Sequence, residues 1–339
     1  MLPHHYYYNK ARWYFIDLIT LLKEKATKKK ATILIAEGWD ERCLQAAARL
    51  LSQNSMAIHL LGNPQEIKEK ARQLGLDITN AVIVDSADTH RKQVFAQELY
   101  QLRKEKGMTQ EEAHQLLENY NYFACMYVAL GYADALAGSA ICPTAELMRP
   151  ALQILKGPGL VSEISVFTSA SGKVFLCTDV SLNPQPTATQ LAQIAGKAIT
   201  AAAHSGIVPV VAFLSYSTKG SGGDSPELQL IREATSLAKQ AYPEVVIDGE
   251  LQVDAAVNSY AAMRKCPTSP IQGNATILVM PNLMASNIFG HAMMQFSTLT
   301  YQFAMLQGMK KPVGIIGRSV PVEAVERVLL SLAMEVNTA

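Results

Sequence analysis

The segment 215–223 gathers hydroxyl groups and glycines directly after an apolar run that is typical of a buried strand. It reads Ser215-Tyr216-Ser217-Thr218-Lys219-Gly220-Ser221-Gly222-Gly223. Such a loop can present successive backbone N–H groups and hydroxyls to an anion. Its residue order is not that of a Walker loop, which requires G-x-x-x-x-G-K-[ST]. The alternative, a surface loop that binds no ligand, stays open.

Acidic residues follow the next apolar run, where Asp248, Glu250 and Asp254 fall within seven positions. We place them where a strand gives way to a helix. In an open parallel sheet this end of a strand is where ligands collect, so the carboxylates are candidates for chemistry. Carboxylates at the start of a helix also cap it and interact favourably with the positive end of its dipole. The sequence leaves both interpretations open.

Arg318 follows a third apolar run and would bring the five N–H donors of its planar guanidinium group into the cleft at the ends of these strands. Arg42, Arg103 and Arg149 also lie near the ends of expected strands or helices. Guanidinium groups suit the oxygens of a carboxylate or a phosphate. For any one of these arginines, a solvated surface position is the simpler alternative.

Metal and disulfide chemistry find little support in the sequence. Apart from the adjacent pair His4 and His5, the seven histidines show no metal-ligand spacing, and we predict no structural metal. The five cysteines are far apart and form no CxxC pair, which favours a reducing cytoplasm. Cys142 lies close to Arg149 in sequence and could act as a nucleophile, although no nearby histidine supports a thiolate.

Short apolar runs alternate with longer segments of helical period, which predicts parallel strands joined by crossover helices. The expected strands of the first half are 31–37, 57–61, 81–85 and 133–138, and the expected helices are 41–52, 65–74, 90–106, 109–120, 122–130 and 143–155. Thr109 and Glu112 have the spacing of a capping box. A cluster of turn residues at 157–159 suggests a domain boundary.

The second half is predicted to open with an antiparallel hairpin, 161–167 with 173–180. Strands are then expected at 208–216, 245–248, 275–280 and 313–316, with helices at 187–204, 227–240, 254–265, 287–308 and 321–335. Residues 266–309 contain no Asp, Glu, Lys or Arg. Because polar residues interrupt this stretch, we predict a buried strand followed by a helix packed on both sides, rather than a membrane span.

Composition bounds the function further. The chain has 339 residues, of which 49% are apolar and 17% charged, as in an ordinary globular protein of about two domains. The net charge of +1 gives no overall basic footprint for nucleic acid and no single-sign surface for a membrane. Residues 1–15 lack the apolar core of a secretion signal, so we expect a cytoplasmic protein.

Taken together, these segments resemble the phosphate acetyl/butyryl transferases, the phosphotransacetylase family, from about Ile16 to Ala333. The densest similarities are the segments 102–109, 148–154, 183–188, 214–221 and 248–256. The resemblance implies two three-layer α/β domains of the isocitrate/isopropylmalate-dehydrogenase-like kind with an interdomain cleft. We expect residues 1–156 plus 311–339 to form the first domain and residues 157–310 the second.

The reaction implied by the resemblance is reversible transfer of an acetyl group between coenzyme A and inorganic phosphate. It implies small-molecule substrates only, no cofactor beyond coenzyme A as substrate, no covalent acyl-enzyme and a homodimer. Such chemistry needs arginines for a dianion, a base for the thiol proton and donors for the oxyanion.

The family's active-site arginines correspond to Arg103, Arg149 and Arg318 in this chain. We assign substrate contacts to Ser215, Ser217, Thr218, Gly220 and Asn287. Around Arg318 the chain departs from the family pattern, because Gly317 replaces a serine and Ala324 replaces the aspartate proposed as base. A histidine expected before the Arg149 helix is missing near Cys142, and Glu323 could replace the lost base only if its helix shifted.

Three hypotheses follow. The first is an acetyltransferase in which the three arginines hold the phosphoryl oxygens. The second is a catalytically weakened relative with a binding or regulatory role, which the changes at Gly317 and Ala324 suggest. The third is the same scaffold acting on a longer acyl group or another phosphorylated metabolite. A positioned base contributes about 10² to 10⁴ in rate, so its loss leaves the first two open.

Overall fold

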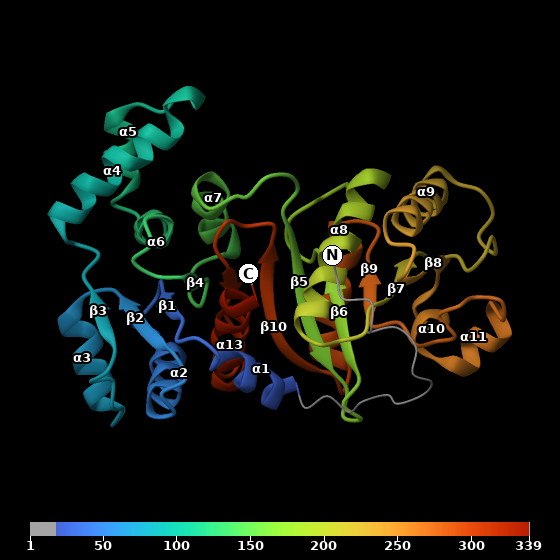
Figure 1. Cartoon of the computed structure of the whole chain (residues 1–339), viewed down its shortest axis with the longest axis horizontal. Helices are drawn as coiled ribbons and strands as arrows, with labels where there is room; N and C mark the ends of the chain where they lie inside the picture. Colours follow the sequence, from blue (N-terminus) through green and yellow to red (C-terminus); the bar gives the residue numbers. More distant parts are fainter. Residues whose placement is uncertain (1–17, 339) are drawn as a thin grey trace.

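The structure is a computed structural model that describes residues 18–338. The predictions for residues 1–15, among them the His4–His5 pair and the lack of a secretion signal, lie outside the described residues. Within the described part, eleven strands form one continuous sheet in the order β3-β2-β1-β4-β11-β10-β5-β6-β9-β7-β8 (Figure 1). The mixed α/β fold predicted from the sequence is confirmed.

The strands are β1 (Thr32–Ile35), β2 (Ala57–Leu61), β3 (Val82–Val84), β4 (Ala135–Gly138), β5 (Ser162–Thr168), β6 (Val174–Thr178), β7 (Val210–Leu214), β8 (Val246–Leu251), β9 (Ile277–Val279), β10 (Thr300–Gln307) and β11 (Val313–Ile315). The helices are α1 (Leu18–Ala26), α2 (Glu41–Ser52), α3 (Pro64–Gln73), α4 (Thr89–Arg103), α5 (Gln110–Leu116), α6 (Tyr120–Ala129), α7 (Thr144–Ile154), α8 (Ala188–His204), α9 (Pro226–Ala241), α10 (Val253–Val257), α11 (Ser259–Lys265), α12 (Leu283–Phe296) and α13 (Val322–Thr338).

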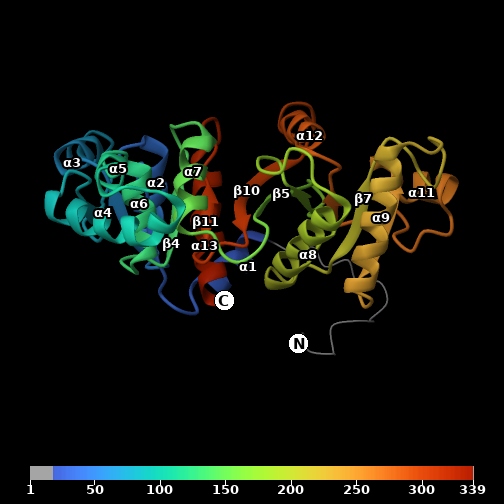
Figure 2. The ribbon, with the colours of Figure 1, turned by 90° about the horizontal axis from the view of Figure 1, so that it is seen from above.

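The apolar strands are buried on both faces, and this places helices above and below the sheet. In β1, Ile33 and Ile35 join a core with α1, α2, α8, α9 and α13, whereas Leu34 faces a second core with α4, α6 and α7. A third core lies under α10 and α11, with α12 packed against it. Figure 2 shows α8 and α12 on opposite sides of β5. The result is three layers, helix on sheet on helix.

The centre of the sheet is antiparallel. The predicted hairpin is confirmed, since β5 and β6 pair antiparallel from Ile164–Thr178 to Thr168–Val174. The prediction of one helix over 287–308 is wrong, because α12 ends at Phe296 and residues 300–307 form β10 between β11 and β5. A central strand is apolar on both faces, so it lacks the alternation that marks a half-buried strand.

Three smaller predictions about helices have different outcomes. The capping box is confirmed, with Thr109 at the N-cap of α5 and Glu112 returning a hydrogen bond. The single helix expected at 254–265 is two helices, because Asn258 ends α10 and caps α11. The helix α12 is not packed on both sides, since Met284 and Ile288 are largely exposed. Among the described residues, no helix combines the length and apolar character needed to span a bilayer.

Two connections join the halves of the molecule and run side by side. The backbone N–H of Gly157 donates to the Gly308 carbonyl over 3.0 Å, and Lys156 pairs with Met309. A Cβ at Gly157 would lie 2.6 Å from that carbonyl oxygen, so the crossing requires glycine there. The expected domain boundaries fall beside this crossing and stay a prediction. Helix α13 then returns to pack on α1 and α2.

Candidate functional site

Arg103 and Arg149 lie around the same side chain, that of Tyr122. Arg103 ends α4 and its Nη1 donates to the Gln153 carbonyl at 3.4 Å, while the Tyr122 hydroxyl donates to Oε1 of Gln153 at 2.9 Å. Gln153 lies one turn beyond Arg149 on α7, so the Arg103 guanidinium contacts the helix that carries Arg149. Burial raises the pKa of Tyr122, and the charges of Arg149 and Arg103 oppose that rise. The structure therefore brings two of the three predicted arginines together.

Both arginines have unused donors. The Nε of Arg103 is buried without a hydrogen-bond partner. The side chain of Arg149 is exposed, and no ion pair or hydrogen bond joins it to another described residue. The buried Nε of Arg103 favours an anionic ligand, because a buried donor without a partner costs about 1–3 kcal/mol, whereas the donors of Arg149 are open to solvent.

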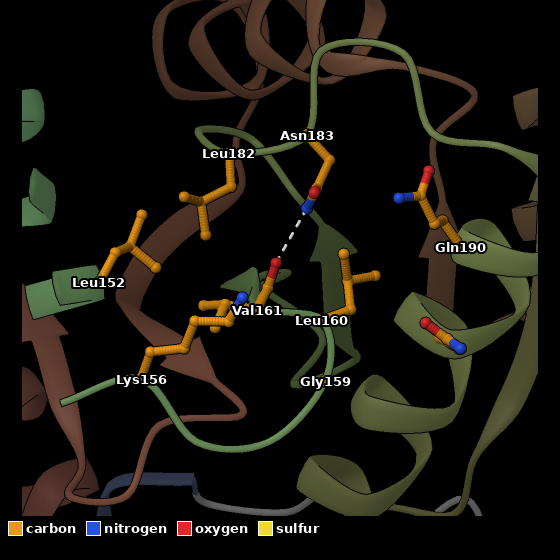
Figure 3. A pocket seen from close by; sticks show the side chains of 9 residues that line it. Leu152, Lys156, Gly159, Leu160, Val161, Leu182, Asn183 and Gln190 are labelled. Atoms are coloured by element: carbon orange, nitrogen blue, oxygen red, sulfur yellow. Dashed lines mark hydrogen bonds between the residues drawn. The ribbon is translucent and has the colours of Figure 1, made fainter. Parts of the chain in front are cut away.

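A cavity of about 420 Å³ lies beside the end of α7 (Figure 3). Leu152 of α7 lines it, whereas Arg149, one turn earlier on the same helix, is not among its lining residues. Opposite stand Asn183 and Gln190, the latter on α8. The amide of Asn183 donates to the Val161 carbonyl at 2.9 Å, which fixes the back wall. The other lining residues are Lys156, Gly159, Leu160, Leu182 and Gln193.

The cavity lies between elements of the two halves and combines apolar walls with amides and a cation. A size of about 300–1,000 Å³ with few polar groups is typical of ligand sites. Lys156 and Leu152 come from the α7 side, whereas Gln190 and Gln193 come from α8. The expected interdomain cleft, like the domain boundaries, stays a prediction.

Arg318 occupies the loop after β11 and is exposed. Its carbonyl accepts from the Arg42 guanidinium at 3.0 Å, and no hydrogen bond or ion pair engages its own guanidinium within residues 18–338. Arg42 joins this loop to Ala140, which precedes α7, whereas Arg103 contacts the far part of α7. The convergence of all three guanidinium groups on one anion stays a prediction.

The 215–223 loop is organised around an internal carboxylate. Oε1 of Glu250 accepts from the Ser217 hydroxyl at 3.1 Å and from the Gly220 backbone N–H at 2.7 Å. Arg232 adds two hydrogen bonds to the same carboxylate. Burial raises the pKa of Glu250, but these donors together hold it down at about 2. The donors that the sequence suggested for an external anion are thus used within the protein.

The remaining hydroxyls of this loop have internal partners too. Ser215 donates to the Ser217 carbonyl at 2.9 Å. Thr218 is buried, donates to Gln252 at 3.3 Å and accepts from its backbone N–H at 3.0 Å. Lys219 pairs with Asp248 at 2.6 Å. Substrate binding by Ser215, Ser217, Thr218 and Gly220 stays a prediction.

The acidic run has a structural role in the same region. Asp248 is 2% exposed and pairs with Lys219 and Lys239, so its pKa lies below the usual value despite burial. Asp254 pairs with Lys265 at 2.7 Å, and Gln252 occupies the N-cap of α10. Two segments with strong family resemblance, 214–221 and 248–256, therefore bind one another.

Asn287 lies on the exposed helix α12, where its Nδ2 donates to the Val180 carbonyl at 3.2 Å. That bond ties α12 to the end of β6. The Asn287 side chain does not line the cavity described above. Its predicted contact with substrate is therefore not brought into that cavity and stays a prediction.

The positions that depart from the family pattern behave differently. Gly317 is partly exposed, and a Cβ there would lie 3.0 Å from a methyl group of Val320. Ala324 is fully buried among apolar side chains of α13. Glu323 pairs with Arg49 of α2 at 3.1 Å, so in this arrangement its carboxylate is engaged on the surface.

Sequence reasoning missed three buried carboxylates, Glu37, Glu163 and Asp179. Glu37 is 0% exposed and accepts from the backbone N–H groups of Ala140, Ile141 and Cys142 and from the Tyr120 hydroxyl. Its place at the end of the expected strand 31–37 was the signal available. Burial raises the pKa of Cys142, so a free thiolate there is disfavoured.

The second missed carboxylate is Glu163 of β5, 3% exposed, whose pKa burial raises to about 7. Its Oε1 accepts from the Ser165 hydroxyl at 2.6 Å, and its backbone N–H donates to Asp179. Burial likewise raises the pKa of Asp179. Asn183, which lines the cavity, also donates to Asp179, so the two carboxyl groups lie behind the cavity wall. An acidic residue inside an otherwise apolar strand was the signal available.

Comparison with known proteins adds to this geometry. Residues 17–333 match the family described as "Phosphate acetyl/butaryl transferase". The chain belongs to this family. It is 38% identical over 330 residues to a phosphate acetyltransferase of Thermoanaerobacterium thermosaccharolyticum, a match that covers 94% of this chain and 99% of the relative.

Solved structures agree with the family assignment. A phosphotransacetylase from Streptococcus pyogenes superimposes with a TM-score of 0.84 at 34% identity, over 95% of this chain and 98% of that one. A putative 4-hydroxythreonine-4-phosphate dehydrogenase from Salmonella typhimurium gives 0.54 at 12% identity, over 91% of this chain and 100% of that one. The second likeness shows the fold alone and fits the expected dehydrogenase-like architecture.

Proposed function

We propose that this member of the phosphate acetyl/butaryl transferase family transfers an acetyl group reversibly between coenzyme A and inorganic phosphate. Family membership over residues 17–333 supports the reaction class. The observation that carries the proposal is the buried Nε of Arg103, which has no hydrogen-bond partner while the same guanidinium contacts α7, the helix of Arg149. Coenzyme A enters as a substrate, and the proposal needs no resident cofactor.

In the proposed reaction, the sulfur of coenzyme A attacks the carbonyl carbon of acetyl phosphate. A C–S bond forms, the C–O bond to phosphate breaks, and phosphate leaves with the electron pair of that bond. Arg103, Arg149 and Arg318 bind the phosphoryl oxygens and stabilise the charge that develops on them. No acyl-enzyme forms, because the acetyl group passes directly from oxygen to sulfur.

The thiol proton leaves to solvent in this proposal, because Ala324 offers no carboxylate. An ordinary thiol is a few per cent ionised at neutral pH, which supports slow turnover without a dedicated base. The rate should therefore rise with pH until the thiol is fully ionised. The buried Ala324 also supports a second candidate, a weakened relative that binds the same substrates for a regulatory purpose.

The deciding experiment mixes purified protein with acetyl phosphate and coenzyme A and follows the thioester by its ultraviolet absorbance. We expect turnover, and Arg318→Ala should abolish it. Propionyl and butyryl phosphate test the third possibility, a longer acyl group. No thioester from any of the three phosphates, together with calorimetric binding of coenzyme A, would instead support the regulatory candidate.

We further propose that the protein is a homodimer that pairs through α12. This helix carries no Asp, Glu, Lys or Arg and exposes Met284, Ile288 and Phe296, the last at 90%. A second copy of the chain fits this surface, because two uncharged faces meet without desolvating an ion. Ile288→Asp should halve the mass seen in sedimentation velocity. Val208→Asp, at an exposed apolar site elsewhere, should leave it unchanged.

A further inference from the structure

Arg42, near the start of α2, contacts three separate parts of the chain. Its Nη1 donates to the carbonyl oxygens of Gly317 and Arg318, each at 3.0 Å, and of Val320 at 3.1 Å. Its Nη2 donates to the Ala140 carbonyl at 2.7 Å. The planar guanidinium thus joins the loop after β11 to the loop after β4.

The remaining donors of Arg42 are used within its own turn. Asp40 accepts from Nε at 3.2 Å and from Nη2 at 3.1 Å, and it also caps α2. A guanidinium has five N–H donors, and every nitrogen here has a protein acceptor. Its side chain is 22% exposed. Arg42 is therefore neither a solvated surface residue nor an open site for an anion.

Glu37 complements Arg42 from the same turn. Its carboxylate accepts from the backbone N–H groups of Ala140, Ile141 and Cys142, while Arg42 takes the carbonyl of Ala140. Glu37 and Arg42, at the junction of β1 and α2, therefore bind both the N–H groups and a carbonyl group of the loop that leads into α7. The same turn also holds the loop that carries Arg318, so both loops share one support.

Arg318 itself shows why such a support matters. Its side chain is exposed, and only its backbone carbonyl has a recorded hydrogen bond within the described part of the chain. A long side chain on an unsupported loop samples many positions, and fixing it costs entropy each time a ligand binds. Three backbone anchors from one guanidinium reduce that cost before the ligand arrives.

We propose that Arg42 is a positioning residue, which fixes the loop carrying Arg318 against the entry to α7 so that the Arg318 guanidinium is ready for an anionic substrate. The inference rests on the proposed function for its kinetic consequence, but the support of the loop itself is a separate, measurable property.

The first experiment uses Arg318 as its own reporter, because trypsin cleaves after an arginine only when the surrounding backbone opens. Limited digestion of the native protein is followed by mass spectrometry for the fragment that begins at Ser319. Arg42→Ala should raise its rate of appearance about tenfold or more, since several charge-assisted hydrogen bonds are lost. Arg42→Lys should be intermediate, because one ammonium cannot span acceptors from two loops.

Arg49→Ala is the matched control. Arg49 lies on the same helix and also reaches the C-terminal region, where it pairs with Glu323 and Glu326, but it contacts neither loop. Its removal should leave cleavage after Arg318 unchanged. Equal cleavage in wild type and Arg42→Ala, or equal increases in both variants, would overturn the proposal. This arm gives an answer even if the protein transfers no acetyl group.

The second experiment is a double-mutant cycle on kcat/KM for acetyl phosphate, with Arg42→Lys, Arg318→Lys and the double variant. If Arg42 acts through Arg318, the first change lowers the value about 10- to 100-fold in wild type and has little further effect in Arg318→Lys. Fully additive losses would contradict a positioning role. A wild type without turnover would refute the proposed function while leaving the cleavage result to decide on Arg42.

Discussion

The Ser217 hydroxyl donates to the buried carboxylate of Glu250 over 3.1 Å, and the oxygen that accepts it also accepts the Gly220 backbone N–H. This relationship turns a loop that looks like an anion site into part of the scaffold. Arg232 completes the arrangement by balancing the charge. The carboxylate of Glu250, an anion that belongs to the chain itself, therefore fixes the conformation of the loop.

Glu250→Ala should therefore lower stability more than it alters substrate affinity. The Ser217 hydroxyl and the Gly220 N–H lose their acceptor and the Arg232 guanidinium loses its partner, so we expect a loss of about 2–3 kcal/mol in the free energy of unfolding. Urea titration measures this loss. KM for acetyl phosphate should change less than about twofold. A large rise in KM with unchanged stability would mean that the loop binds substrate after all.

Arg149→Gln and Arg103→Gln should each lower kcat/KM for acetyl phosphate about 10- to 100-fold, because each removes charge-assisted hydrogen bonds to a phosphoryl group. Lysine at either position should recover only part of the rate, since a point charge cannot bind two oxygens side by side. Arg264→Gln, on the exposed part of α11, serves as control. Steady-state kinetics that show no difference among the variants would remove both arginines from the site.

Glu163 should make stability fall as pH rises. Its folded pKa of about 7 lies above the ordinary value of 4.5, so between these values the folded protein holds a proton that the unfolded chain has released. Stability from this group is fully present below about pH 4.5 and is lost as pH rises through 7. Glu163→Gln should remove this slope and stabilise the protein at pH 8 by an amount on the order of 3 kcal/mol.

Thermal or urea unfolding at several values between pH 5 and 8 measures the effect of Glu163→Gln. Glu98→Gln, at an exposed carboxylate of α4, is the matched control and should leave the slope as it is in wild type. Parallel curves for wild type and Glu163→Gln would show that the Glu163 carboxyl group is ionised throughout. In that case hydrogen-bond donors around the carboxylate would have to offset the cost of burying its charge.

The two altered positions near Arg318 should respond differently when the family residue is restored. Gly317→Ser needs the Val320 side chain to give by only a few tenths of an ångström, so the unfolding free energy should change by less than about 1 kcal/mol. Ala324→Asp places a carboxylate in a fully buried position and should cost about 2–4 kcal/mol at pH 7. Thermal unfolding compares them.

The same two variants report on activity. Restoring a hydroxyl at 317 adds a donor beside Arg318, and we expect a rise in kcat of a few-fold in the thioester assay. Ala324→Asp should raise the rate only if α13 moves enough to expose the new carboxylate. A large gain in rate without loss of stability would show that position 324 reaches the cleft in solution.

Most helices and parallel strands could be predicted because their signals are local. The capping box of Thr109 and Glu112 marks the start of α5. A turn rich in serine and glycine joins β5 to β6 and indicates the hairpin. The strand β10 could not be predicted in this way. Both its faces are buried between neighbours that are distant in sequence, so its composition equals that of a buried helix.

The site was predictable only in part, for a related reason. Arg103 and Arg149 were singled out through the family resemblance, because on the residues alone a solvated surface position was the simpler alternative for each. The partners that decide what a group does were not visible, since they come from elsewhere in the chain. Ser217 and Glu250 are 33 residues apart, and nothing local indicates that they satisfy one another. Arg42 was set aside as a surface residue for the same reason.

The contact between Arg42 and Gly317 joins positions separated by 275 residues. During synthesis, the strands β1 to β4 leave the ribosome long before the segment that completes their site. The part of the nascent chain that contains β1 to β4 therefore lacks its C-terminal contacts until nearly the last residues emerge. A ribosome stalled short of α13 would present a protein in which Arg42 does not yet hold the loop that carries Arg318, and a chaperone able to shield exposed apolar surface would be needed most at that moment.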